Sequence, residues 1–153
     1  MDKRTEFSVA LKDSLRSKDQ VATATIRLIL AALKGRDIAS RGDGKGDEIS
    51  DAEILSMLQS MIKQREESGK TYAEAGRDDL ALREQQEIEV IRRFMPEQMS
   101  EQQVKQKIDE LMTEMEVSDI KDMGKVMAEL KERYSGQIDM GKASGLVRQK
   151  LVA

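Results

Sequence analysis

The chain has 153 residues, of which 39% are hydrophobic, 36% are charged and 3% are aromatic, and its formal net charge is −3. It contains no Cys and no His. The missing side chains exclude disulfides, thiolate nucleophiles, Ser-His-Asp triads and zinc sites built on His or Cys. The acidic balance argues against a strongly basic nucleic-acid-binding protein and leaves only a local basic patch for that role.

Four helices are expected before Pro96, the only proline. Apolar residues recur at helical spacing over about residues 2–17 and again after Asp19, until the glycine-rich segment 41–46, where the second helix should fray. Ser50 and Glu53 have the spacing of a capping box and predict the start of a third helix. Gly76 is a suitable residue to end it, and Asp78 is expected to cap the fourth helix.

Three more helices are expected after Pro96. Ser100 and Gln103 form a second capping-box pattern, another helix should span about residues 119–134, and Asp139 can cap the last one. The sequence therefore predicts an all-α protein. Its N-terminal domain, residues 1–95, would consist of helical hairpins with about four helices, and its C-terminal domain, residues 96–153, would be a three-helix bundle.

Several familiar site patterns fail on inspection. The glycine-rich segment 42–46 does not satisfy the Walker A pattern, and the acids that follow Asp43 lack the spacing of a calcium-binding EF-hand loop. Glu84, Glu87 and Glu89 lack the His residues of a di-iron carboxylate site. We expect no metal and no cofactor, and no catalytic residue is assigned.

One charged residue falls on the apolar side of each of two neighbouring helices. Arg65 lies among Ile54, Leu58 and Ile62, and Glu84 lies among Leu80, Ile88 and Ile91. A buried charge is costly unless it is paired. We expect Arg65 to pair with Glu84 or Glu87 inside a helical hairpin, as a structural ion pair that fixes register rather than as a catalytic group.

Basic residues are scattered among acids. Arg27 and Lys34 share one helix face seven residues apart, and Lys63 and Lys70 repeat that spacing. Solvated helix faces explain these patterns about as well as phosphate contacts do. Gly124 and Lys125 are more suggestive, because a glycine near a helix start allows close approach to an anion.

Several stretches together resemble the GatB/YqeY family, and most closely its free-standing YqeY-like members. The resemblance covers nearly the whole chain, although no single motif is diagnostic. The family's usual aromatic-Leu-Pro joint is Phe94-Met95-Pro96 here. The matching stretches are Arg27–Lys34, Ile62–Ser68, Tyr72–Ala81, Glu84 with Glu87 and Ile88, Phe94–Ser100, and Asp122–Met127.

The resemblance implies relatedness to the tail of GatB, a subunit of the glutamine-dependent tRNA amidotransferase, a carbon–nitrogen ligase. In that enzyme the tail grips tRNA, whereas amidation and glutamine hydrolysis occur elsewhere. We therefore expect an RNA-binding accessory module that is not catalytic alone and has tRNA as its expected partner. The expected RNA contacts are Lys121, Gly124, Lys125, Lys142 and Arg148.

Two alternatives stay open. The acidic net charge and the scarcity of stacking aromatics favour a protein–protein adaptor that does not bind RNA. The other alternative is a component of an amidotransferase complex. The N-terminus opens no apolar run of signal-peptide length, and no segment approaches a membrane span. We accordingly expect a cytoplasmic protein without a membrane partner.

Overall fold

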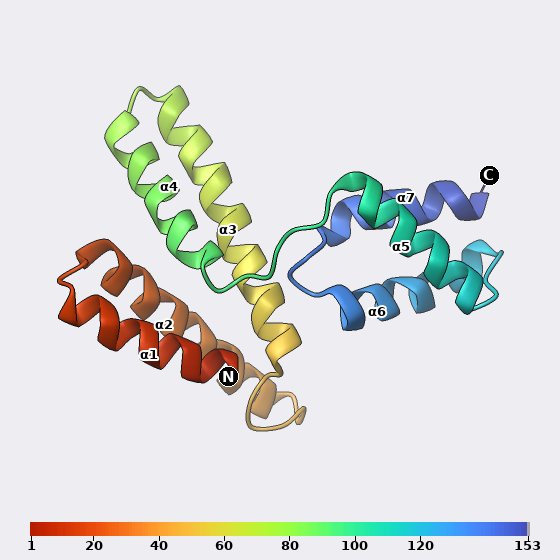
Figure 1. Cartoon of the computed structure of the whole chain (residues 1–153), viewed down its shortest axis with the longest axis horizontal. Helices are drawn as coiled ribbons and strands as arrows, with labels where there is room; N and C mark the ends of the chain where they lie inside the picture. Colours follow the sequence, from red (N-terminus) through yellow and green to blue (C-terminus); the bar gives the residue numbers. More distant parts are fainter. Residues whose placement is uncertain (153) are drawn as a thin grey trace. The chain divides into compact units, whose positions relative to one another are not determined.

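The computed structural model describes residues 1–152, and in this range it contains seven α-helices, one short 3-10 helix and no strand. The prediction of an all-α fold is confirmed. The helices gather into two compact units, residues 1–95 and the residues from Pro96 onward, and Figure 1 shows both. Each unit has its own hydrophobic core. Within the described range no helix is long and apolar enough to cross a membrane.

Unit 1 consists of two helical hairpins, as Figure 1 shows. The first joins α1 (Lys3–Arg16) to α2 (Gln20–Gly42), and the second joins α3 (Asp51–Glu74) to α4 (Asp78–Arg92). The side chains of Asp2, Asp19 and Ser50 cap α1, α2 and α3 by accepting a hydrogen bond from a backbone N–H in the first turn. Such caps satisfy donors that a helix start otherwise leaves without partners.

The turn between α3 and α4 differs from the prediction. Gly76 adopts φ +74° and ends α3, with the N–H groups of Gly76 and Arg77 bonded to the carbonyls of Ala73 and Tyr72. This is the pattern of a Schellman motif. Because the Arg77 N–H belongs to this motif, α4 begins at the next residue. The prediction that Asp78 caps α4 was therefore wrong: Arg77 is the N-cap, it makes no side-chain capping bond, and Asp78 is the first helical residue.

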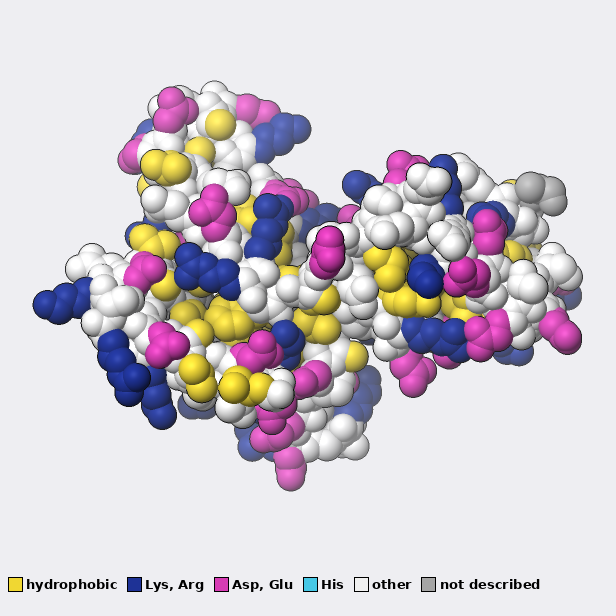
Figure 2. Space-filling model, viewed as in Figure 1, with side chains coloured by type: hydrophobic (Ala, Val, Ile, Leu, Met, Phe, Trp, Pro, Cys, Tyr) yellow, Lys and Arg dark blue, Asp and Glu magenta, His cyan; other side chains and the backbone are white. Residues whose placement is uncertain are grey.

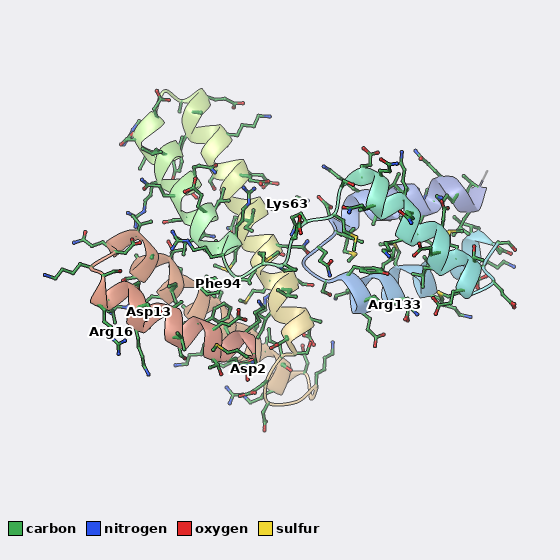
Figure 3. The ribbon with its side chains drawn as sticks, in the orientation of Figure 1. Asp2, Asp13, Arg16, Lys63, Phe94 and Arg133 are labelled. Atoms are coloured by element: carbon green, nitrogen blue, oxygen red, sulfur yellow. The ribbon has the colours of Figure 1, made fainter. Side chains whose placement is uncertain are left out.

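The two hairpins of unit 1 share one core. Phe7 of α1 is completely buried, and its ring meets the Phe94 ring edge-to-face with the centroids 4.9 Å apart. Figure 3 labels Phe94 just beyond the end of α4. Lys3 Nζ also donates to the Phe94 carbonyl at 2.7 Å. The remaining core side chains come from α2, α3, α4 and the segment before α3, which contributes Ile49. They include Ile29, Ile54, Leu58 and Ile91.

Unit 2 contains α5 (Glu101–Glu114), the 3-10 helix η1 (Ile120–Asp122), α6 (Met123–Tyr134) and α7 (Met140–Val152). Its core combines Ile108 and Leu111 of α5 with side chains of α6 and α7. Ser100 and Gln103 form both halves of the predicted capping box. The helix predicted from residue 119 starts with the 3-10 turn and becomes an α-helix only at Met123.

A charged cluster ties α1 and α2 to the segment that leads into α3. Arg4 Nη1 and Nη2 donate to the two carboxylate oxygens of Asp37 at 2.8 and 2.9 Å. The backbone N–H of Ile49 also donates to Asp37, and Arg4 donates to the Ile49 carbonyl. The Arg4 hydrogen bond is the largest cause that lowers the pKa of Asp37, and the Ile49 N–H acts in the same direction.

A second charged cluster links α3 to α4 within their hairpin. Arg65 Nε donates to Glu87 Oε2 at 2.9 Å, and both side chains are only 13% exposed. Arg65 also donates to the Met61 carbonyl, and Arg83 reaches the other Glu87 oxygen at 3.3 Å. Glu84 forms no ion pair within the described residues. Its pKa is raised, first by burial and then by the charge of Glu87.

We expect the Asp37 carboxylate to make the free energy of unfolding depend on pH. A pKa lowered by folding contributes stability that is present above the ordinary value of 3.8 and lost as the pH falls through the folded value. We expect Asp37→Asn to lower the free energy of unfolding by about 1–3 kcal/mol at pH 7, and to lower it less at acid pH, where the wild-type carboxylate is also protonated. Urea unfolding at the two pH values measures both differences. Asp43→Asn, at an exposed acid in the next loop, is the control, and an equal Asp37→Asn deficit at both pH values would contradict the assignment.

The Arg65–Glu87 pair predicts strong coupling in a double-mutant cycle. Arg65→Met leaves a largely buried carboxylate, and Glu87→Met leaves a largely buried guanidinium, so each should cost about 1–3 kcal/mol. The double variant should cost clearly less than the sum of the two, because neither Arg65 nor Glu87 remains as a largely buried charge without its partner. Urea unfolding at neutral pH measures the cycle, and strictly additive losses would show that the pair does not stabilise the hairpin.

Candidate functional site

The Arg65 cluster is arranged to hold helices together. Arg65 donates to Glu87 of α4 and to the Met61 carbonyl of its own helix, so it is engaged on both sides. The helices approach closely here, since a Cβ on Gly69 would lie 3.6 Å from the Glu84 Cβ. The cluster contains the carboxyl groups of Glu84 and Glu87 and the guanidinium groups of Arg65 and Arg83, but no nucleophile. This geometry suits a register-setting pair better than a catalytic centre.

The glycine-rich loop after α2 closes on itself. Gly44 and Gly46 have φ values of +70° and +110°, and the Ser40 hydroxyl donates to the Gly46 carbonyl at 3.1 Å. The N–H of Lys45 bonds to the Ser40 carbonyl, which completes a Schellman ending for α2. Positive φ values explain glycine at both positions without any ligand. Among residues 1–152 the structure contains no group of three or more acidic side chains placed to hold a metal ion.

The five candidate RNA-contact residues lie on unit 2. Lys121 is in η1, while Gly124 and Lys125 are in the first turn of α6. Lys142 is near the start of α7 and Arg148 is in its second half. All five are exposed. A Cβ on Gly124 would meet no atom within 4 Å, so internal packing does not explain this glycine.

The three elements that carry these residues are all neighbours, because η1, α6 and α7 contact one another. The helices α6 and α7 are joined by a short loop, which brings the end of α7 that bears Arg148 back towards the start of α6. Lys142 lies six residues from Arg148, roughly 9 Å along the helix axis and on another face. The structure therefore does not gather all five positions into one site.

Ion pairs separate the basic residues of unit 2 into two groups. Arg133, labelled in Figure 3, donates to both oxygens of Glu114 at 2.9 Å and to Glu129 at 2.8 Å, and these carboxylates raise its pKa. Lys105, Lys107 and Lys150 also pair with carboxylates. Within the described residues Lys121, Lys142 and Arg148 form no ion pair, and Lys125 lies 3.9 Å from Asp122 Oδ1.

The face of unit 2 visible in Figure 2 has cationic and anionic side chains interspersed. A single dominant basic patch is not visible there. Lys131, an exposed lysine of α6, also lacks an ion pair among residues 1–152 and is not one of the five predicted contacts. Only the structure shows which cations are already neutralised by neighbours, so no sequence signal could have separated it from the paired residues.

Unit 1 carries a basic row that the sequence only partly revealed. Arg27 and Lys34 were noted for their spacing of seven residues, and the row continues to Arg41. The second helix was expected to fray from Arg41 onward, but α2 runs to Gly42. Arg41 is thus helical and continues the spacing.

The comparisons with known proteins agree with the resemblance noted in the sequence. A family model described as "Yqey-like protein" matches residues 4–151. "Altered inheritance of mitochondria protein 41, mitochondrial" from Saccharomyces cerevisiae is 30% identical over 131 residues, which cover 84% of this chain and 66% of the yeast protein. The protein of that name from Lachancea thermotolerans is 28% identical over 120 residues, which cover 77% and 62%.

The chain thus spans less than two thirds of the length of these yeast relatives. The family match nevertheless extends across both helical units and through the joint at Phe94-Met95-Pro96. On this evidence, the chain belongs to the YqeY-like protein family.

Proposed function

We propose that this protein is an RNA-binding accessory module that contacts the phosphate backbone of tRNA through unit 2. The proposal rests on the resemblance to the tail of GatB and on one structural observation. Lys121, Lys142 and Arg148 are exposed and have no carboxylate partner in the described part of the chain, while Arg133 is held by two. Unpaired cations can replace the counterions that surround RNA, whereas paired cations must first lose a protein partner.

Recognition would depend on shape and phosphate position. Unit 2 has one aromatic side chain, Tyr134, so it is poorly equipped to stack on unpaired bases. The grooves of A-form RNA are read largely through phosphates and 2′-hydroxyls. Exposed cations on η1, α6 and α7 suit such contacts, and the open space at Gly124 would let a phosphate approach the backbone.

The protein would act by binding rather than by bond making. Without Cys and His it lacks the thiolate of a glutaminase and the common base of acyl transfer. Association with glutamine-dependent tRNA amidation is therefore proposed only through a complex in which another subunit supplies the chemistry. A cytoplasmic location is also part of the proposal.

A salt titration tests RNA binding. Anisotropy with labelled bulk tRNA and the full chain should show binding at about 50 mM salt that weakens steeply towards 200 mM. Lys121→Gln/Lys142→Gln should lower the affinity roughly tenfold and reduce the salt slope by about two, because two phosphate contacts are lost.

Lys105→Gln/Lys107→Gln is the matched control, since it removes two lysines of the same unit that already pair with glutamates. It should leave the affinity within about twofold of wild type. Failure of the wild-type chain to bind tRNA at low salt would reject the proposed function. Equal losses in the two double variants would reject the assigned contacts.

The alternative function is a protein–protein adaptor that does not bind RNA. The exposed apolar side chains Leu28 and Ile38 on α2 favour it, because they offer a contact surface that phosphate binding would not use. A partner that copurifies unchanged after nuclease treatment, together with no tRNA binding at low salt, would support the adaptor.

A further inference from the structure

Helix α2 has an unusual outer side. Its inner side packs Ala22, Ile26, Ile29 and Leu33 into the core of unit 1. At about 100° per residue, the opposite side presents Leu28, Ala31, Gly35, Ile38 and Ala39 to solvent. Leu28 is 46% exposed and Ile38 is 51% exposed. The solvent side of a surface helix normally carries polar residues, so α2 is apolar on two opposite sides.

One edge of this outer side carries three cations. Arg27, Lys34 and Arg41 follow one another at intervals of seven residues, about 10.5 Å along the helix axis. All three are exposed and have no ion pair among residues 1–152. The only acidic residue of α2, Asp37, is already bonded to Arg4 and to the Ile49 N–H.

The start of this row borders a shallow hollow between α1 and α2. The hollow has a volume of about 250 Å³ and is lined by Leu15, Lys18 and Arg27 together with polar and small residues, and no carboxylate lines it. The other end of the row is less purely basic, because Lys34 and Arg41 share a hollow with Asp37, Asp47 and Glu48. Carboxylates therefore lie close to Lys34 and Arg41 but do not line the hollow at Arg27.

The middle of the outer side allows another backbone to come close. Ala31 and Gly35 are exposed and lie one helical turn apart, and a Cβ on Gly35 would meet nothing within 4 Å. Small residues flanked by larger apolar ones let a second helix pack at short distance. A membrane surface would instead favour bulky aromatic and leucine side chains, and RNA would need the cations but not the apolar strip.

We propose that the outer side of α2 docks an amphipathic helix of a partner protein, with the partner's apolar strip on Leu28, Ala31, Gly35 and Ile38. Carboxylates at seven-residue intervals along one edge of that helix would meet Arg27, Lys34 and Arg41. This surface goes beyond the proposed RNA contacts of unit 2 and does not depend on them. A second copy of the chain fits poorly, because two α2 helices packed antiparallel would place the basic row beside its own copy.

Two designed helical peptides provide the test. Both carry the same Leu/Ala strip, and they differ only at one edge, where every seventh residue is Glu in one peptide and Lys in the other. With the full chain, anisotropy should show the Glu peptide binding at least tenfold more tightly than the Lys peptide, with a preference that weakens as salt increases. In Arg27→Glu/Lys34→Glu/Arg41→Glu the order of the two peptides should reverse.

Two further variants show whether peptide binding depends on the position of the basic row and on the small residue at Gly35. Lys12→Glu/Lys45→Glu/Lys70→Glu changes three exposed cations on other segments and gives the same net charge, so it should keep the wild-type order. Gly35→Gln leaves the charge unchanged and fits the open space, so the fold should be retained, as circular dichroism can verify. It should weaken the Glu peptide at least fivefold, because the backbones can no longer approach closely.

The proposal would be overturned if neither peptide binds, if both bind equally, or if the triple Glu variant of α2 (the triple reversal) does not change the order of their affinities. A tRNA complex that is lost in the triple reversal and is insensitive to Gly35→Gln would show that the row binds phosphates instead. The peptide experiments contain no RNA, so their outcome does not depend on the result of the tRNA titration that tests unit 2.

Discussion

The fold of unit 1 depends on an apolar contact in which α1 meets the segment that directly follows α4. Phe7 and Phe94 account for half of the four aromatic residues in the chain, and they pack against each other at the centre of the unit. With so few large rings, the remaining volume is filled by aliphatic side chains and by Met57 and Met61. The edge-to-face contact fixes the end of α4 against α1 and so sets where the second hairpin packs on the first.

Hydrophobic burial of this kind leaves little freedom for charge inside the core. The two charged clusters of unit 1 accordingly lie where the apolar core ends. Arg4 and Asp37 close the side of the core where α2 leads into α3, and Arg65 and Glu87 continue the α3–α4 contact beyond Met61. In both clusters a guanidinium bonds a carboxylate and a backbone carbonyl, so one side chain extends the contact between neighbouring elements beyond the apolar core.

Local signals in the sequence were sufficient for most element boundaries. Short polar residues before apolar periodic segments predicted the caps at Ser50, Ser100 and Asp139, because a cap is decided by residues within one helical turn. Two boundaries differ from the prediction. Arg77 completes the end of α3 and therefore also precedes α4, and the 3-10 turn at Ile120–Asp122 replaces the first turn predicted for α6.

Side-chain partners were harder to predict than helices. The helical period places Arg65 on the side of α3 that faces α4, but only the axial register of the two helices decides between Glu84 and Glu87, and the structure has Glu87 bonded. The charges of unit 2 pose the same difficulty on a larger scale. Whether a lysine is free or paired depends on carboxylates from other helices, such as Glu114 for Arg133, and one-dimensional spacing contains no such information.

The position of Phe94 has a consequence during protein synthesis. Lys3 and Phe94 are joined by a hydrogen bond across 91 residues of sequence, and Phe7 is buried against the same segment. While the ribosome is still making α3 and α4, the inner side of α1 has no complete surface to pack on. The first hairpin therefore keeps part of its apolar side exposed until the last turn of α4 has left the exit tunnel, and exposed apolar surface of this kind favours aggregation during synthesis.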